Sequence, residues 1–187
     1  YDLSGSSIHQ RQPSGALQPI FKTNILNGKP VFRFDGTQYM TSLANRAGRN
    51  IMGVTILAVF KTTEVAVSSY ILSCGTRIYA NKLQGRQRLL ARRLDADTLE
   101  NVQSAIGVIG TTNFYYGTWA VDYSTGSGSI YLNGVLSGTN PTLLTAAGTG
   151  SSSDTTSAVV LGNTGAPWFG DIAEVLLYNR YLTLPEI

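Results

Sequence analysis

Three acidic residues lie close together in the sequence, as Asp95-x-Asp97-x-x-Glu100. Two carboxylates about 5–5.5 Å apart, one acting as nucleophile and one as general acid, are what a retaining glycoside hydrolase needs. Because side chains alternate along a strand, a strand over this segment would put Asp95 and Glu100 on opposite faces. We therefore expect a solvated loop. Asp95 and Asp97 are the candidate calcium ligands, since Ca²⁺ prefers carboxylate oxygens.

Basic residues concentrate just before this acidic segment. Six of the 14 Lys and Arg residues of the chain are Arg77, Lys82, Arg86, Arg88, Arg92 and Arg93. Strand alternation places Arg86 and Arg88 on one face and Gln87 and Leu89 on the other. The charges either protect an edge strand from pairing or form a patch for an anionic partner, such as an acidic or sulfated glycan or another chain. No aromatic residues interleave the run, so nucleic acid is a poor partner.

The remaining reactive residue types are scarce. The chain has one histidine, His9, and no G-x-S-x-G nucleophile elbow. A Ser-His-Asp triad would therefore have to use His9 and lacks the usual setting for its serine. A zinc site with several His or Cys ligands is excluded by number. The single cysteine, Cys74, follows an apolar run and is expected to be a buried strand residue.

The composition indicates an all-β domain. Only 13% of the residues are charged, against about 25% in typical globular proteins, and 20 of 187 residues are glycine. Apolar segments recur at spacings of roughly ten to fifteen residues with almost no helical periodicity, a pattern typical of an antiparallel sandwich. No apolar run approaches the roughly 18 residues of a membrane span, and a net charge of +3 is too small to indicate nucleic acid.

Some strands can be placed from their patterns. Gly53–Thr62 is apolar on both faces and is predicted to be central. Asn133-Gly134 predicts a type I′ hairpin turn. The closing strand, Trp168–Thr183, loses its alternation at Val175–Tyr178, so either both faces are covered there or a bulge shifts the register.

The N-terminal part is rich in turn residues. Positions 1–29 are expected to be mostly irregular. Pro30–Asp35 reads as a strand, Gly36 turns the chain, and Tyr39–Leu43 reads as the returning strand. The carboxylate of Asp35 is expected to bond backbone amides of the turn.

Four stretches carry a family resemblance, in order: Asp2-Leu3-Ser4-Gly5 with His9; Asn27-Gly28-Lys29-Pro30-Val31-Phe32-Arg33-Phe34-Asp35-Gly36; Trp119–Tyr123 with Ile130–Val135; and Phe169-x-Gly-Asp-Ile-Ala-Glu-Val-x-x-Tyr-Asn-Arg-x-Leu. They resemble the laminin-G-like jellyroll domains of the concanavalin A-like lectin/glucanase superfamily. The resemblance implies a two-sheet jellyroll with Trp119 in its core. Glucanases of the superfamily carry E-x-D-x-x-E, whereas Asp95 is one methylene shorter than Glu and would misplace a nucleophile.

The resemblance implies a non-enzymatic binding module for a glycan or surface polysaccharide, acting in carbohydrate recognition or adhesion at a cell or virion surface. In such modules loop aromatics stack on sugars, while polar side chains, sometimes with calcium, fix hydroxyl groups. The predicted ligand-binding residues are Trp168, Tyr115, Tyr116, Arg86, Arg88, Arg92 and Arg93.

Two other functions stay open. The second is a structural or assembly module of a larger surface or virion protein, such as a fibre, decoration or adhesin, that binds protein partners or itself. The third is a glycoside hydrolase using Asp95, Asp97 and Glu100. We expect residues 1–187 to form a single domain of a longer protein, located outside the cell, on its surface or in a virion.

Overall fold

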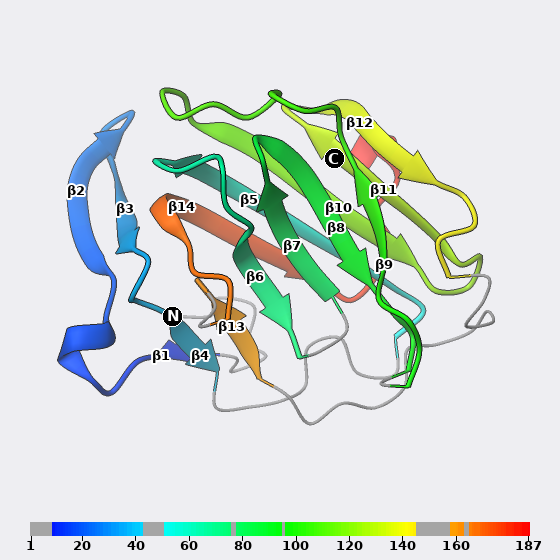
Figure 1. Ribbon diagram of the computed structural model, residues 1–187, viewed down its shortest axis with the longest axis horizontal. Coiled ribbons are helices and arrows are strands. Elements are labelled where there is room, and N and C mark those ends of the chain that lie inside the picture. Colours follow the sequence, from blue (N-terminus) through cyan, green and yellow to red (C-terminus); the bar gives the residue numbers. More distant parts are fainter. Residues whose placement is uncertain (1–8, 43–50, 76–77, 95, 145–157, 163–164) are drawn as a thin grey trace.

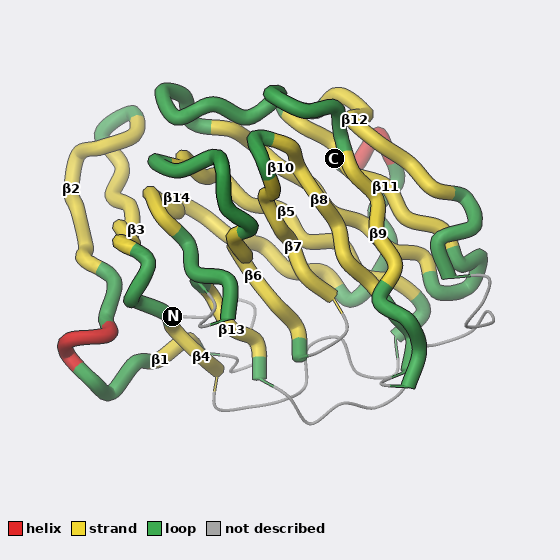
Figure 2. Tube along the Cα trace, viewed as in Figure 1, coloured by secondary structure: helices red, strands yellow, loops and turns green. Residues whose placement is uncertain are grey.

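The computed structural model describes residues 9–42, 51–75, 78–94, 96–144, 158–162 and 165–187. Its strands form two seven-stranded antiparallel sheets that stack as a sandwich (Figure 1). Helical structure in this part of the chain is limited to short 3-10 turns, such as η1 (Gly15–Leu17) and η3 (Leu184–Glu186) (Figure 2). The predicted all-β, two-sheet jellyroll is confirmed.

The strands of each sheet come from distant parts of the sequence. Sheet A has the order β1 (Gln10–Arg11), β4 (Met40–Ser42), β13 (Val159–Leu161), β6 (Ser69–Cys74), β7 (Ile78–Leu83), β8 (Arg86–Ala91) and β9 (Glu100–Gln103). Sheet B has the order β12 (Val135–Asn140), β11 (Ser127–Leu132), β10 (Tyr115–Asp122), β5 (Gly53–Thr62), β14 (Phe169–Tyr178), β3 (Lys29–Asp35) and β2 (Ile20–Leu26).

Among the described helices, none has the length and apolar character needed to cross a membrane.

The core lies between the inner faces of the two sheets. β5 is central in sheet B, as its two apolar faces predicted, and Val54, Ile56 and Phe60 point inward. The Phe60 ring packs against Trp119, with centroids 5.9 Å apart, and edge-on against Trp168 at 5.5 Å. The predicted core position of Trp119 is confirmed.

Three local predictions about turns and burial are confirmed. Asn133 and Gly134 both have positive φ between β11 and β12, as a type I′ turn requires. The Asp35 carboxylate accepts bonds from the backbone amide and the hydroxyl of Thr37, at 3.0 and 2.7 Å. Cys74 is buried, and its burial raises the pKa of the thiol to about 12.

Other predictions about the strands are wrong. Positions 1–8 lie outside the described residues, but positions 9–29 are not mostly irregular, because β2 occupies Ile20–Leu26 and pairs with β3. The return strand after Gly36 does not pair with β3: β4 crosses to sheet A and pairs with β1 and β13. The bulge of the closing strand falls between Ile172 and Glu174, before the apolar run rather than within it.

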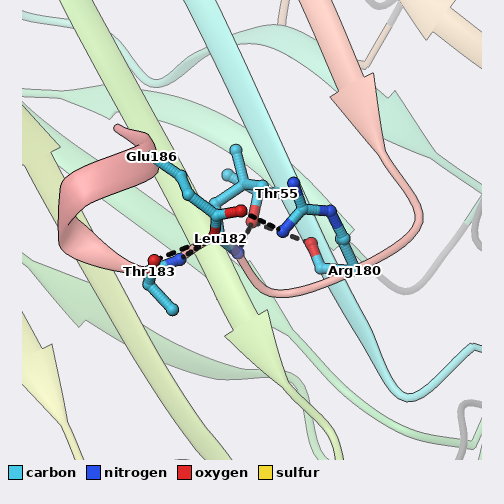
Figure 3. Close-up of polar contacts among 5 residues, drawn as sticks. All are labelled: Thr55, Arg180, Leu182, Thr183 and Glu186. Atoms are coloured by element: carbon cyan, nitrogen blue, oxygen red, sulfur yellow. Dashed lines mark hydrogen bonds and ion pairs between the residues drawn. The ribbon is translucent and has the colours of Figure 1, made fainter.

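After this bulge the closing strand alternates regularly. Val175 and Leu177 pack against the core, while Leu176 and Tyr178 face outward. The chain then crosses the outer face of sheet B. There the Thr55 hydroxyl donates to the carbonyl of Arg180 and accepts the amide of Leu182, both at 2.9 Å (Figure 3).

Candidate ligand-binding face

Two arginines of β8 point to the outer face of sheet A. Leu89 and Ala91, on the same strand, belong to the core, and Gln87 is fully buried. Arg86 and Arg88 therefore lie on the opposite face, as their spacing predicted, and both are half-buried. β8 is not an edge strand, because β9 covers its outer side. The interpretation of these charges as protection for an edge strand is wrong.

Strand register aligns four polar side chains across sheet A. Tyr70 in β6 pairs with Asn81 in β7, Asn81 pairs with Arg88 in β8, and Arg88 pairs with Gln103 in β9. We call Tyr70, Asn81, Arg88 and Gln103 the polar row. Because neighbouring strands lie about 4.8 Å apart, the row is about 14 Å long. Figure 1 shows its four strands side by side in one layer.

An aromatic pair lies at one end of the polar row. The Tyr70 and Tyr79 rings have centroids 4.7 Å apart and an interplanar angle of 38°. Tyr79 is paired in register with Leu90 and lies next to the row on the same face. Both tyrosines are half-buried, so each keeps part of its surface open to solvent. The outer face of sheet A therefore combines aromatic, amide and guanidinium groups, the mixture that binds sugars in protein sites.

Hydrogen bonds fix some of these side chains and leave other groups without partners. Arg86 Nη1 donates to Gln103 Oε1 at 2.6 Å, and Gln103 Nε2 donates to Asn101 Oδ1 at 2.7 Å. Asn81 Nδ2 donates to Ser68 Oγ at 3.0 Å. In contrast, Asn81 Oδ1, Arg86 Nε and Arg88 Nε are covered but have no hydrogen-bond partner in the described structure. Unpartnered covered groups of this kind are costly unless water or a ligand completes them.

A protein-family comparison fits this arrangement. The matching model is described as "Concanavalin A-like lectin/glucanases superfamily" and covers residues 32–187. The chain belongs to this superfamily. No curated protein matches it in sequence.

Solved structures related to this superfamily domain include several at low sequence identity. The sialidase module CBM40 of Ruminococcus gnavus, bound to α2,3-sialyllactose, has a TM-score of 0.61 at 16% identity, with 89% of this chain and 94% of that chain covered. Domain 4 of the arabinanase AbnA from Geobacillus stearothermophilus, in complex with arabinotriose, has a TM-score of 0.58 at 12% identity, covering 90% and 78%. Domains LG4-5 of mouse laminin α1 have a TM-score of 0.59 at 11% identity, covering 81% and 43%. At these identities the likeness establishes the fold.

The aromatic residues predicted to bind ligand lie elsewhere in this superfamily domain. Trp168 has no exposed surface, so the expectation of an accessible aromatic at this position is wrong: Phe60 and other core residues enclose it. Tyr115 stacks on Phe60, and its hydroxyl accepts the amide of Gly110. Tyr116 lies in sheet B, and its hydroxyl donates to the carbonyl of Ile187. The fold does not bring these three residues to the polar row.

The basic residues of the Arg-rich stretch do not form one patch. Lys82 points inward and is fully buried. Arg92 and Arg93 follow the end of β8, and Arg92 Nη1 contacts the carbonyl of Asp97 at 3.4 Å. Arg77 lies outside the described residues. Of the predicted cationic residues, the fold brings Arg86 and Arg88 to the same face.

The acidic segment is not a continuous strand. Asp97 lies in a turn, where its carboxylate accepts the amide of Leu94 at 2.7 Å, and Glu100 begins β9 opposite Ala91. Asp95 is outside the described residues. Within the described ranges no group of three His, Cys, Asp or Glu residues is placed to hold a metal ion. The loop expected around Asp97 is confirmed, and this turn uses its carboxylate for a backbone bond.

The sequence interpretation missed the partners of the two arginines. Tyr70, Tyr79, Asn81, Asn101 and Gln103 were not among its candidates. A signal was present, because in β7 the inward Ile78 and Ala80 alternate with Tyr79 and Asn81. What was lacking was the register that lines these residues up with Arg88, since that register depends on pairing between strands.

Proposed function

We propose that this chain is a carbohydrate-binding module that holds a glycan on the outer face of sheet A. The polar row carries this proposal. It places the half-buried Arg88, whose side chain makes no hydrogen bond or ion pair within the described part of the chain, between the fully buried Asn81 and the half-buried Gln103 and beside the Tyr70–Tyr79 pair. Tyrosine faces stack on the apolar side of a sugar ring, while amides and guanidinium groups bond its oxygens.

The related structures support the ligand class. The Ruminococcus gnavus module is bound to sialyllactose, and the Geobacillus stearothermophilus domain is in complex with arabinotriose. One is part of a sialidase and the other is a domain of an arabinanase, and for this chain we propose a binding role without catalysis. The turn around Asp97 supports it, because the motif does not continue as one strand toward Glu100. We propose an extracellular setting, at a cell or virion surface.

A glycan array tests the proposal. We expect the purified chain to bind a subset of glycans and the Tyr79→Ala variant to lose about fivefold in affinity, because a stacking contact on a tyrosine ring contributes about 1 kcal/mol. Tyr178→Ala is the matched control, since Tyr178 is an exposed strand tyrosine on the outer face of sheet B. Repeating the array with a chelator shows whether calcium takes part. Equal losses in both variants, or no glycan bound by the parent chain, would contradict the proposal.

One observation favours the second candidate function, a module for protein partners. β2 is the edge strand of sheet B and exposes Ile20, Phe21 and Ile25, with 50%, 57% and 40% of their surfaces accessible. Exposed apolar edge strands pair readily with other chains. Light scattering over a range of protein concentrations tests self-association through this edge. A dimer that dissociates in the Phe21→Ser variant would support it. The same dimer should persist in the Val135→Ser variant, which changes the opposite edge strand.

A further inference from the structure

We infer that the glycan bound at the polar row is acidic, carrying a carboxylate or a sulfate that Arg86 and Arg88 bind together. This inference rests on the proposed function and names the ligand class of the same face. The two arginines are two positions apart in β8, so their Cα atoms lie about 6.7 Å apart along the strand and their side chains leave the same face. That spacing lets both guanidinium groups reach one anionic group or two neighbouring ones.

One of the two arginines is already positioned. Arg86 Nη1 donates to Gln103 Oε1 at 2.6 Å, and Gln103 is in turn held by its bond to Asn101. This chain of bonds uses Nη1 of Arg86, and Nε is covered, so Nη2 is the nitrogen left for a ligand. Gln103 also pairs in register with Arg88, so the residue that is bonded to Arg86 is also the neighbour of Arg88 across the strands. A group that is fixed before binding loses less side-chain entropy when it bonds a ligand.

The charges of Arg86 and Arg88 are not neutralised by the protein. Neither forms an ion pair with a carboxylate in the ranges that the structure describes, and the residues paired with them in register are Leu83, Asn81 and Gln103, all uncharged. Half-buried charges interact more strongly than exposed ones because the surrounding dielectric is lower.

Arg33 and Arg180 are the internal comparison. Arg33 makes a two-pronged ion pair with Asp171, at 2.6 and 2.8 Å, and Arg180 contacts Glu186 at 2.7 Å. Arg33 therefore has a carboxylate in the two-bond geometry that guanidinium groups prefer, and Arg180 has a carboxylate through one bond. Arg86 and Arg88 have no carboxylate partner of this kind within the described residues. A ligand bound to the outer face of sheet A would supply the negative charge. A neutral sugar hydroxyl would bond the nitrogen atoms but would not balance the charge.

The test compares glycans that differ only in their acidic group. Suitable pairs are sialyllactose with lactose, a galacturonan oligomer with its methyl ester, and a sulfated galactan oligomer with its unsulfated form, measured by calorimetry at low and physiological salt. We expect the acidic member of at least one pair to bind about tenfold or more tighter, because bonds to charged groups contribute about 1.5–3 kcal/mol. The preference should weaken as salt rises.

Variants then test whether the preference for the acidic glycan depends on the two arginines. Arg86→Gln and Arg88→Gln should each remove most of the preference for the acidic member, whereas Arg88→Lys keeps the charge and should retain part of it. Lys29→Gln is the matched control, because Lys29 is an exposed cation on β3 in sheet B. Thermal melting of each variant shows that the fold is intact, and the Arg88→Lys result keeps the test valid if a glutamine variant is unstable.

Each outcome has a defined meaning. A preference for carboxylated or for sulfated members identifies the anion and supports the inference. Equal binding of acidic and neutral members overturns the inference but leaves glycan binding in place. An equal loss in Lys29→Gln also overturns it, because it shows attraction by overall charge. No binding of any member overturns both the inference and the proposed function.

Discussion

Gln87 in sheet A is hydrogen-bonded to Thr118 in sheet B: its side-chain amide donates to the Thr118 carbonyl at 2.9 Å. The same Nε2 atom also donates to the carbonyl of Tyr131, at 3.0 Å. The backbone of Gln87 exchanges bonds with Ser104, whose hydroxyl accepts its amide. Because Gln87 lies between Arg86 and Arg88, these bonds hold the strand that carries both arginines against the opposite sheet.

The Gln87→Leu variant should be less stable than the parent chain. It keeps most of the side-chain volume but removes both bonds between the sheets, and buried groups that lose their partner cost about 1–3 kcal/mol each. The variant also removes Gln87 Oε1, which is buried without a hydrogen-bond partner in the described structure, so this offsets part of the cost. We expect the free energy of unfolding to fall by about 1–3 kcal/mol in total, measured by urea denaturation. Gln84→Leu, in the exposed turn before β8, is the control and should change it by less than about 0.5 kcal/mol. Equal effects of the two variants would show that the bonds between the sheets contribute nothing.

Lys82 predicts an unusual dependence of stability on pH. Its ammonium group is fully buried and donates to the carbonyls of Glu64 and Val67, at 2.5 and 2.8 Å. Burial lowers the pKa of Lys82 from 10.5 to about 8, partly offset by the charge of Glu64. Between these two pH values the unfolded chain binds the proton and the folded chain does not, so the free energy of unfolding should rise with pH in that window and be flat below it.

The measurement compares the parent chain with Lys82→Met between pH 7 and 10. The difference in their free energies of unfolding should grow in favour of the parent chain above pH 8, by up to about 1.4 kcal/mol per pH unit. Taking the difference removes the contributions of tyrosines that ionise at high pH. A difference that stays constant over the whole range would show that Lys82 has an ordinary pKa in the folded protein.

Thr55 should hold the C-terminal segment on sheet B. Its hydroxyl both accepts from Leu182 and donates to Arg180, and Leu182 is buried (Figure 3). Thr55→Val conserves shape but leaves the Leu182 amide without a partner, so we expect a loss of about 1–3 kcal/mol. Hydrogen exchange should show faster exchange of the Leu182 amide. Thr183→Val, which removes an exposed bond to Glu186 in the same segment, should have little effect. Unchanged protection of Leu182 in Thr55→Val would refute this role.

Gly170 should not tolerate a side chain. Its φ is +133°, and an added Cβ would lie 2.1 Å from the carbonyl oxygen of Lys61 in the neighbouring strand. Backbone strain and overpacking together predict that Gly170→Ala lowers the free energy of unfolding by roughly 3 kcal/mol or more. Gly15→Ala is the matched control, because a Cβ at Gly15 meets no atom within 4 Å. A thermal melt in which both variants resemble the parent chain would contradict the packing seen at Gly170.

Local patterns were enough to predict much of the fold. The two apolar faces of Gly53–Thr62 indicated a central strand, Asn133-Gly134 indicated a hairpin turn, and Asp35 indicated a turn carboxylate, all as observed. These features depend on residues close together in the chain. The burial of Trp168 was not predictable in the same way, because it depends on Phe60, more than a hundred positions away.

The sequence alone determined that β8 would present Arg86 and Arg88 on one face, since alternation follows from strand geometry. It could not determine what lies beside them. β8 is interior rather than an edge only because β9 pairs with it, and Arg88 meets Asn81 and Gln103 only through the register of three strands. Register is set by packing of whole strands against the core, so the tertiary structure decided which side chains share the candidate site.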